Sequence, residues 1–435
     1  MTPNRYYLNQ DLTARAGMHF SGDDEVYLFS TTTDFIAMVD STSFEVLVQV
    51  AQGKSVSEIA HALDFSGEES KAFFDGLEED KLITSRPTSA RLFEQAPDTD
   101  VRPLEQTIIV LTDKCNLACP FCYRASNPHQ DNTITPESAF SLIPILNRHG
   151  LVELTLSGGE PLVVPYFKEI YQEARRQPFR INLQTNLTLF HKWLSFFQTT
   201  GFPSSITTSC DVYKGDGHEF DRISQNLRQC VGSGMRVAVN MMIQPRAIDK
   251  AAFAALFHEL HDMGIPLISI GSPMPINQHD KNLFFESLEW ATFIVNLQRE
   301  VEKSNDELAP RNAVGVDPHL VCGAGDYLCV IQNGLFLLPC AAMPQYGIRL
   351  ESPSAFSSVW SSPRTFESFR NPRALLNECI SCDSFLKCQG GCKARALYSL
   401  GALDLPDVWN CAVFGKPTTV GDGCLFDRPL ENSEA

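Results

Sequence analysis

The sequence predicts an α/β protein whose centre is a partial (β/α)6 barrel, open at one side. Three observations predict this fold. From Thr107 onward, short β-prone runs alternate with helical runs; a hairpin and a set of helix caps precede them; and cysteines crowd the last third of the chain. Six consecutive strand–helix units imply a parallel sheet with right-handed crossovers. Because eight units close a full barrel, six leave it incomplete.

Patterning divides the 435 residues into five parts. We expect a small α+β domain, a linker rich in Pro, Ser and Ala, the barrel, a helical connection and a cysteine-rich extension. The expected boundaries are residues 1–88, 89–104, 105–275, 276–315 and 316–435.

The N-terminal domain is predicted from a hairpin followed by three helices, a winged-helix-like order. Ser55 caps the second helix, and Glu58 three residues later completes a capping box. The third helix has Phe73, Phe74 and Leu77 on one face and acidic residues on the other. The expected strands are Glu25–Phe29 and Asp34–Val39. The expected helices are one capped by Ser41 or Thr42 that runs to about Ala51, then Val56–Leu63, and then about Glu68 to Leu82.

The barrel is predicted from strands that each precede a helix. Thr135, Pro136 and Glu137 open its first helix as N-cap, N1 residue and first-turn acid, and Gly150 closes that helix. The expected strands are Thr107–Leu111, Leu151–Leu156, Ile181–Thr185, Ser205–Ser209, Val237–Met242 and Pro266–Ile270. Further helices are expected near Tyr166–Arg176, up to Gly201, from about Arg222 to Gly234, and at Lys250–Gly264.

Charge and cysteine content restrict the function. The net charge of −17 disfavours nucleic acid, whose binding depends on Lys and Arg neutralising phosphates. Residues 1–90 carry 15 acidic and 6 basic side chains, a balance that suits a basic partner but that solubility explains equally well. We expect neither a signal peptide behind Met1–Arg5 nor a membrane span. In a cytoplasmic protein, 14 cysteines point to metal binding or catalysis rather than disulfides.

Three cysteines follow the first barrel strand with the spacing C-x3-C-x2-C: Cys115, Cys119 and Cys122. Three thiolates on one loop can hold three irons of a [4Fe–4S] cluster and leave the fourth iron open to a ligand. A zinc knuckle is the alternative, but zinc usually takes four Cys or His ligands. No fourth ligand stands at a matching spacing near this loop.

This cysteine run resembles the signature of the radical SAM enzymes. The resemblance implies that S-adenosylmethionine binds the open iron, and that its reductive cleavage yields a 5′-deoxyadenosyl radical that abstracts hydrogen. Catalysis in parallel barrels takes place at the carboxyl ends of the strands, where the cysteine loop falls.

Further motifs at these strand ends are similar to those of the same family. Ser157-Gly158-Gly159-Glu160-Pro161 resembles its Gly-Gly-Glu-Pro motif, which meets the amino group of the methionine moiety. Gln184-Thr185-Asn186 resembles the element near the adenosine, and Ser209-Cys210-Asp211 resembles a Ser-x-Asp-Gly element in which Val212 replaces the glycine. The resemblance therefore implies these cofactor-binding residues: Tyr123, Gly158, Gly159, Glu160, Pro161, Gln184, Thr185, Asn186, Ser209, Arg222 and Asn240.

Several of these assignments keep a plainer alternative. Arg222, expected to pair with the methionine carboxylate, is equally a surface residue at the start of a helix. Asn240, a ribose candidate, is equally a satisfied polar residue inside the barrel. Asp211 and Cys210 are candidate catalytic proton or hydrogen donors, although a cysteine at this position is more commonly buried in packing.

The C-terminal cysteines resemble the SPASM domain, an extension that carries two auxiliary [4Fe–4S] clusters. The resemblance implies interleaved ligation: Cys322, Cys329, Cys340 and Cys392 hold the first auxiliary cluster, and Cys379, Cys382, Cys388 and Cys411 hold the second. Two structural zinc sites are the alternative. If Cys329 were not a ligand, substrate could reach an open iron, and Cys424 is a possible substitute ligand.

Residues 1–88 resemble the PqqD-like peptide-recognition domains. In those domains a leader peptide adds as a strand beside the hairpin and lies against the third helix. A DNA-binding winged helix and a purely structural cap are the alternatives.

The three-part order leads to a functional expectation. We expect a radical SAM maturase that binds the leader of a ribosomal precursor peptide and forms a carbon–carbon, ether or thioether cross-link in it. Three [4Fe–4S] clusters, S-adenosylmethionine and an external electron donor such as flavodoxin or ferredoxin are implied, with neither nucleic acid nor membrane as partner. A peptide epimerase, a sulfatase-type formylglycine maturase and a non-catalytic leader-binding chaperone remain alternatives.

Overall fold

The structure is a computed structural model, and it describes most of the chain. The described residues are 5–16, 25–31, 35–94, 101–119, 122–210, 217–246, 248–276, 278–304, 322–370, 379, 381–388, 390–416, 419–420 and 423–424. Among the described helices, none combines the length and apolar character that a membrane span requires.

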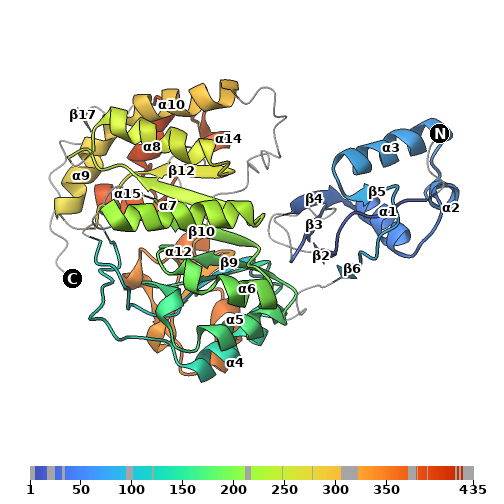
Figure 1. The fold of residues 1–435 in the computed structure, drawn as a ribbon, viewed down its shortest axis with the longest axis horizontal. Coiled ribbons are helices and arrows are strands. Elements are labelled where there is room, and N and C mark those ends of the chain that lie inside the picture. The colour runs from blue at the N-terminus through green and yellow to red at the C-terminus, as the bar shows by residue number, and fades with distance from the viewer. Residues whose placement is uncertain are drawn as a thin grey trace.

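Six parallel strands form the centre of the molecule (Figure 1). They lie side by side in chain order, and α-helices follow them as the crossovers of a partial barrel. This confirms the predicted fold class. The strands are β7 (Gln106–Val110), β8 (Glu153–Ser157), β9 (Arg180–Gln184), β10 (Ser205–Ser209), β11 (Val237–Met242) and β12 (Leu267–Gly271).

The helices around this sheet bury apolar faces against it. Helix α4 begins after Thr135, whose side chain accepts the Ser138 N–H, and it buries Leu142, Ile143 and Leu146. The other helices of this layer are α5 (Phe167–Arg175), α6 (Leu194–Thr200), α7 (Gly217–Gly232) and α8 (Lys250–Asp262), after α4 (Pro136–Arg148). Helix α7 begins five residues before the expected start at Arg222, so the loop after β10 is shorter than predicted.

The C-terminal region extends the same sheet. Strand β13 pairs in parallel with β7, and β14 and β15 follow as antiparallel neighbours. The cysteine-rich region is therefore joined to the barrel through backbone hydrogen bonds at the β7 edge. Its elements are β13 (Leu328–Gln332), β14 (Phe336–Leu338), β15 (Ile348–Arg349), α11 (Phe356–Ser361), α12 (Glu367–Arg370), α14 (Phe385–Cys388), α15 (Lys393–Leu400), α16 (Val408–Val413), β16 (Thr419–Val420) and β17 (Gly423–Cys424).

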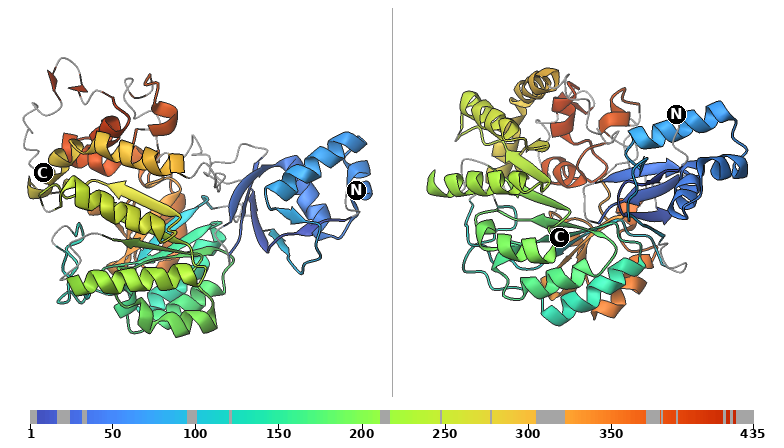
Figure 2. Two further views of the ribbon diagram at one scale, coloured as in Figure 1. Left: turned by 45° about the horizontal axis from the view of Figure 1, so that its top comes forward. Right: turned by 45° about the vertical axis from the view of Figure 1, so that its right-hand side comes forward.

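Two helices connect the barrel to this region, and both lie beside it in Figures 1 and 2. They are α9 (Gln278–Leu288) and α10 (Ala291–Ser304), and α10 packs against α16. Short 3-10 turns complete the chain: η1 (Pro161–Val163), η2 (Phe190–Lys192), η3 (Asn333–Leu335), η4 (Pro344–Tyr346) and η5 (Pro353–Ala355).

The N-terminal unit has its own core and a larger sheet than the predicted hairpin. Its four-stranded sheet has the order β4-β3-β2-β6, and its two outer strands, β4 and β6, are far apart in the sequence. The three predicted helices and the predicted Ser55–Glu58 capping box are present, and a second capping box, Ser66–Glu69, begins α3. The elements are β1 (Tyr7–Leu8), β2 (Leu12–Ala16), β3 (Glu25–Phe29), β4 (Ile36–Asp40), α1 (Ser41–Ala51), α2 (Val56–Ala62), α3 (Gly67–Glu79), β5 (Ile83–Thr84) and β6 (Leu92–Glu94).

Strand β6 falls within the expected linker. It pairs in parallel with β2, which places Leu92 opposite Leu12. The N-terminal unit therefore extends to Glu94. The sequence gives little sign of this pairing, because a three-residue strand joined to a partner about 80 residues away has no local turn signal.

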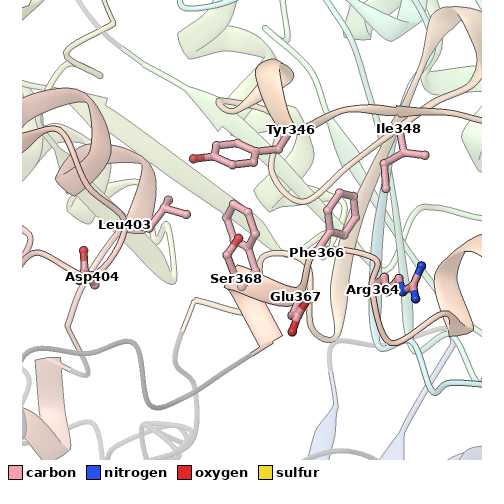
Figure 3. Close-up of a pocket in the computed structure, with 9 residues that line it drawn as sticks. Tyr346, Ile348, Arg364, Phe366, Glu367, Ser368, Leu403 and Asp404 are labelled. Carbon is pink, nitrogen blue, oxygen red and sulfur yellow. The ribbon is translucent and has the colours of Figure 1, made fainter. Parts of the chain in front are cut away.

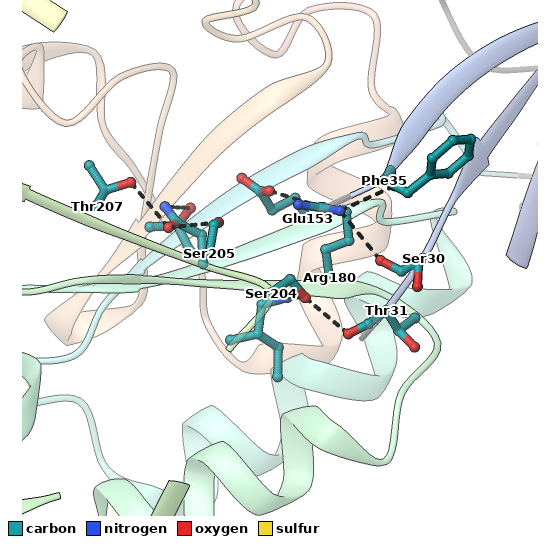
Figure 4. Close-up of polar contacts among 11 residues, drawn as sticks. Ser30, Thr31, Phe35, Glu153, Arg180, Ser204, Ser205 and Thr207 are labelled. Atoms are coloured by element: carbon teal, nitrogen blue, oxygen red, sulfur yellow. Dashed lines mark hydrogen bonds and ion pairs between the residues drawn. The ribbon is translucent and has the colours of Figure 1, made fainter. Parts of the chain in front are cut away.

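The N-terminal unit docks on the amino ends of the barrel strands (Figure 4). Arg180, at the start of β9, donates to the carbonyl oxygens of Ser30 and Phe35 at 3.4 and 3.3 Å. Ser204 donates to the Thr31 carbonyl at 3.0 Å, and the fully buried Arg15 donates to the Leu151 carbonyl at 3.1 Å. The hairpin is therefore held at the end of the sheet opposite the cysteine loop.

Candidate functional site

The cysteine loop and the glycine turn lie against each other at the carboxyl ends of β7 and β8. The Gly159 N–H donates to the Thr112 carbonyl at 2.7 Å, and the Glu160 N–H donates to the Lys114 carbonyl at 2.9 Å. A Cβ atom on Gly159 would lie 2.4 Å from the Lys114 oxygen, and one on Gly158 would lie 2.6 Å from the Thr112 oxygen. Both glycines are therefore required by the close approach of the two loops.

The Glu160 carboxylate joins this pair of loops to the end of β9. It is fully buried and accepts hydrogen bonds from the Thr185 hydroxyl at 2.8 and 2.9 Å and from the Asn186 N–H at 2.8 Å. It also accepts from the Leu162 N–H at 3.0 Å. Such charge-assisted bonds fix the motifs after β8 and β9 relative to each other. The structure thus gives Glu160 a positioning role, in addition to the ammonium contact expected from the sequence.

Asn186 reaches from the end of β9 to the cysteine loop. Its side-chain Nδ2 lies 3.6 Å from the Cys115 sulfur and donates to the Asn116 side-chain Oδ1 at 2.9 Å. Asn116 donates in turn to Thr188 at 2.8 Å. The amide of Asn186 therefore offers a hydrogen bond to a sulfur that the sequence assigns to iron, a kind of contact that tunes cluster potentials.

The electrostatics of the loop thiols fit a metal cluster. Burial raises the pKa of the Cys115 thiol, and the neighbouring Cys122 also raises it. A buried thiolate next to another thiolate is unfavourable alone, whereas a coordinated metal ion deprotonates thiols outright. The residues present therefore fit the [4Fe–4S] cluster that the C-x3-C-x2-C spacing implies.

The C-terminal cysteines gather in two groups. In the first group, burial raises the pKa of Cys340 to about 12, and Cys322 and Cys392 contribute to the rise through like charge. In the second group, burial raises the pKa of Cys411 to about 12, with contributions from Cys388, Cys379 and Cys382. Apart from Cys329, the neighbours named here are members of the expected ligand sets, and the interleaved ligation itself stays a prediction.

Cys329 is placed differently from the other seven. It is fully buried on β13, and its sulfur lies 3.5 Å from the hydroxyl oxygen of Thr107 on β7. Burial raises its pKa to about 12, and no charge interaction joins it to another cysteine of the described residues. To complete the first set, Cys329 would have to turn away from Thr107.

The remaining sequence candidates lie in different surroundings. Pro161 is buried in η1, and Gln184 accepts a hydrogen bond from Ser157 at 3.0 Å. Ser209, the last residue of β10, is opposite Asn240 of β11. The side chains that are open to solvent are Tyr123, Arg222 and Asn240.

Cys210 and Asp211, the two candidate proton or hydrogen donors, differ in what the structure describes of them. Cys210 is 1% exposed and packs in the main core, so its placement is that of the packing alternative. A donor role for it stays a prediction. Asp211 lies outside the described residues.

Two polar residues that sequence reasoning missed extend the row of strand-end groups. Gln244 follows β11 and Ser272 follows β12, and both are buried. The Gln244 Nε2 and Ser272 Oγ atoms have no hydrogen-bond partner among the described residues. Their position two residues past the ends of predicted strands was the available signal. Polar atoms buried without a protein partner suit contact with a polar ligand.

A cavity of about 670 Å³ lies elsewhere, in the C-terminal region (Figure 3). It is lined by aromatic rings, including Tyr346 and Phe369, whose rings meet edge to face at 5.1 Å. Arg364, Glu367 and Asp404 add charges of both signs. None of its lining residues is a candidate cofactor ligand, so we assign it no part in the site.

Comparison with known proteins defines the class. The model of the Radical SAM superfamily matches residues 109–252, which include the cysteine loop and the motifs after β8, β9 and β10. Residues 109–252 are therefore a radical SAM domain, and the protein is an enzyme. This class works with a [4Fe–4S] cluster and S-adenosylmethionine.

Two curated relatives share parts of the chain. The mycofactocin maturase MftC of Mycolicibacterium smegmatis is 23% identical over 333 residues, which cover 71% of this chain and 82% of the relative. The probable GTP 3′,8-cyclase of Methanothermobacter marburgensis is 28% identical over 171 residues, or 39% of this chain. That match spans 55% of the cyclase, about half of its length.

A solved structure extends the likeness over nearly the whole chain. Streptococcus suis SuiB bound to precursor peptide SuiA aligns with a TM-score of 0.58 at 14% identity, covering 92% of this chain and 98% of SuiB. Another structure of SuiB contains S-adenosylmethionine. At this identity the likeness establishes the fold.

The contact between the loops gives a first prediction. We expect Gly159→Ala to displace the cysteine loop, because the new methyl group would meet the Lys114 backbone, and to lower bound iron by about four atoms per chain. Iron and sulfide analysis after anaerobic reconstitution measures this. Gly232→Ala is the matched control, since nothing lies within 4 Å of that site. Full iron content in Gly159→Ala would contradict the assigned role of the turn.

Proposed function

We propose that this protein is a radical SAM maturase that binds the leader of a ribosomally synthesised precursor peptide and forms an intramolecular cross-link in its core. The observation that carries the proposal is a radical SAM domain followed in the same chain by eight further cysteines, which have electrostatic neighbours in one group around Cys340 and another around Cys411. The maturase MftC and the precursor-bound SuiB support the same class of substrate.

The residues for the cofactors follow from the site. Cys115, Cys119 and Cys122 would hold the cluster of the barrel, and the polar groups after β8 to β12 would hold S-adenosylmethionine. Bound there, the cluster and S-adenosylmethionine would supply radical abstraction of a hydrogen atom from a side chain. The chain's own part is to fix the loops through Glu160 and to present Asn186 to the Cys115 sulfur.

The two C-terminal groups would hold auxiliary [4Fe–4S] clusters. A cross-link is a net oxidation by two hydrogens, so one electron remains after hydrogen abstraction and bond formation. Clusters with four thiolates each leave no open iron and suit electron transfer. Cys322, Cys340 and Cys392 would bind the first cluster with Cys329, and Cys379, Cys382, Cys388 and Cys411 would bind the second.

The N-terminal unit would capture the leader, and its placement gives the leader a direction. The carbonyl of Phe35, just before β4, is held by Arg180 of the barrel, so β4 runs away from the barrel toward Asp40. β4 is an outer strand of its sheet. A peptide strand added antiparallel to β4 would run toward the barrel and deliver the core that follows it.

The leader site and the cofactor site lie at opposite ends of the barrel strands. Each strand of the barrel has five or six residues, which span about 17 to 20 Å. The precursor would therefore need at least about five extended residues between its docked strand and the modified side chain.

Mass spectrometry of the product tests the reaction. We expect the small peptide encoded beside this gene, co-expressed with the enzyme under low oxygen, to lose two hydrogens, with the loss mapped to neighbouring side chains. An unchanged mass in water with deuterium uptake in D2O would indicate the epimerase instead. A modified Cys or Ser carrying formylglycine would indicate the sulfatase-type maturase.

A proline at the outer strand tests the docking role. Ser30 donates to Phe35 at 3.0 Å, and alternation along the antiparallel pair then turns the backbone N–H of Met38 outward. We expect Met38→Pro to keep the fold, since an outward N–H is not needed by the sheet, and to weaken leader binding at least about tenfold.

Fluorescence anisotropy with the labelled leader of the same neighbouring peptide measures this affinity on the full chain. Met38→Thr is the control, because it changes the side chain and keeps the N–H. Equal affinities for Met38→Pro and the wild type would reject strand addition at β4.

A further inference from the structure

A buried polar network connects the two groups of C-terminal cysteines, the first around Cys340 and the second around Cys411. At its centre is Asp407, whose side chain is completely buried. The backbone N–H of Cys392 donates to Asp407 Oδ2 at 2.8 Å, which ties the carboxylate to a cysteine of the first group. Asp407 also precedes α16 and accepts the Trp409 N–H at 3.1 Å as its N-cap. Since α16 carries Cys411, the same carboxylate positions a cysteine of the second group.

Arg395 extends this network along α15. Its Nε atom lies 3.1 and 2.9 Å from the two Asp407 oxygens, and a second nitrogen lies 2.6 Å from Oδ2. The same terminal nitrogen donates to the Asn410 side-chain oxygen at 3.2 Å. A planar guanidinium that contacts both a carboxylate and an amide fixes the orientation of that amide.

The oriented amide faces a cysteine sulfur. Asn410 Nδ2 lies 3.8 Å from the Cys388 sulfur, and its oxygen is occupied by Arg395. A continuous chain of contacts therefore runs from the Cys392 N–H through Asp407, Arg395 and Asn410 to the sulfur of Cys388.

The backbone is shaped around the network. Gly391, directly before Cys392, has φ +71, and a Cβ atom there would lie 2.5 Å from the Asp407 Cβ and 3.0 Å from Asn410 Nδ2. Any side chain at this position would push the carboxylate and the amide out of place. Gly391 thus leaves the space that the Asp407 side chain occupies.

We propose that Asp407, Arg395 and Asn410 form one positioning unit that holds the two auxiliary clusters in fixed relation and raises the reduction potential of the second through the Asn410–Cys388 contact. The inference rests on the proposed function, which places one [4Fe–4S] cluster in each of the two groups of C-terminal cysteines. Amide donors at cluster sulfurs stabilise the more negative, reduced state, and they are a recognised determinant of cluster potentials.

The reduction potential is the decisive measurement. We use the full chain with Cys115, Cys119 and Cys122 replaced by Ala, so that only the auxiliary clusters remain, and titrate it with reductant under electron paramagnetic resonance. In this background we expect Asn410→Ala to lower the reduction potential of the second auxiliary cluster by about 59 mV. For a one-electron couple this is about a tenfold shift toward the oxidised form. The other cluster should keep its potential. Ala412→Ser, two residues further along α16, is the matched control.

Asp407→Asn tests the positioning part. It keeps the shape of the side chain but removes the charge that Arg395 contacts, so we expect bound iron to fall at both auxiliary sites, and thermal melting shows whether the chain still folds. In the chain with an intact cysteine loop, the cluster of the barrel should remain. Loss of iron from one auxiliary site alone would overturn the shared role.

The outcomes separate this inference from the function on which it rests. A wild-type chain that holds only about four irons would overturn the auxiliary clusters and, with them, the positioning unit. About twelve irons with unchanged potentials in Asn410→Ala would overturn the tuning role while the proposed function stands.

Discussion

The buried carboxylate of Glu160 is the interaction on which the candidate active site depends. It stands at the meeting point of three strand ends: its backbone N–H is bonded to the cysteine loop after β7, its own turn follows β8, and its oxygens hold Thr185 and Asn186 after β9. A buried charge is tolerated because several donors satisfy it. The two glycines before it bring the backbones close enough for these bonds to form. The order of strands in the sheet would bring the loops after β7, β8 and β9 near each other. The hydrogen bonds of Glu160 then fix how these loops are placed relative to one another.

The same principle recurs in the C-terminal region and at the N-terminal docking surface. Asp407 joins the two groups of C-terminal cysteines through Arg395. Arg180 and Arg15 join the N-terminal unit to the barrel by donating to backbone carbonyls. In each case a buried charged side chain satisfies groups from separate segments of the chain. Removing one such group costs about 1.5 to 3 kcal/mol per charged hydrogen bond, so these joints are rigid relative to ordinary surface contacts. The proposed path of a peptide from β4 to the cysteine loop depends on that rigidity.

Most of the barrel could be predicted from the sequence because its signals are local. Strands β10 and β11 begin and end where the β-prone runs predict, and the Thr135 cap and the Ser55–Glu58 box are present. Strand β6 and the pairing of β13 with β7 were not predicted, since both join segments that are far apart and carry no turn between them. The ligand sets of the C-terminal cysteines stay a prediction from the sequence, whereas the contact of Cys329 with Thr107 depends on that unforeseen strand pairing. The roles of Glu160 and Asp407 as joints also required the tertiary structure, because their partners come from other loops.

Binding of S-adenosylmethionine to the reduced protein tests the central claim most directly. The reconstituted wild type and Glu160→Gln are titrated with S-adenosylmethionine, and the electron paramagnetic resonance spectrum of the barrel cluster is recorded. If Glu160 holds the three strand ends in one site, the wild-type spectrum changes when S-adenosylmethionine is added. The variant then requires at least about tenfold more S-adenosylmethionine. A tenfold loss of affinity corresponds to about 1.4 kcal/mol, which is less than the contribution of one charged hydrogen bond. A wild-type spectrum that does not respond, or a variant that responds like the wild type, would contradict the account.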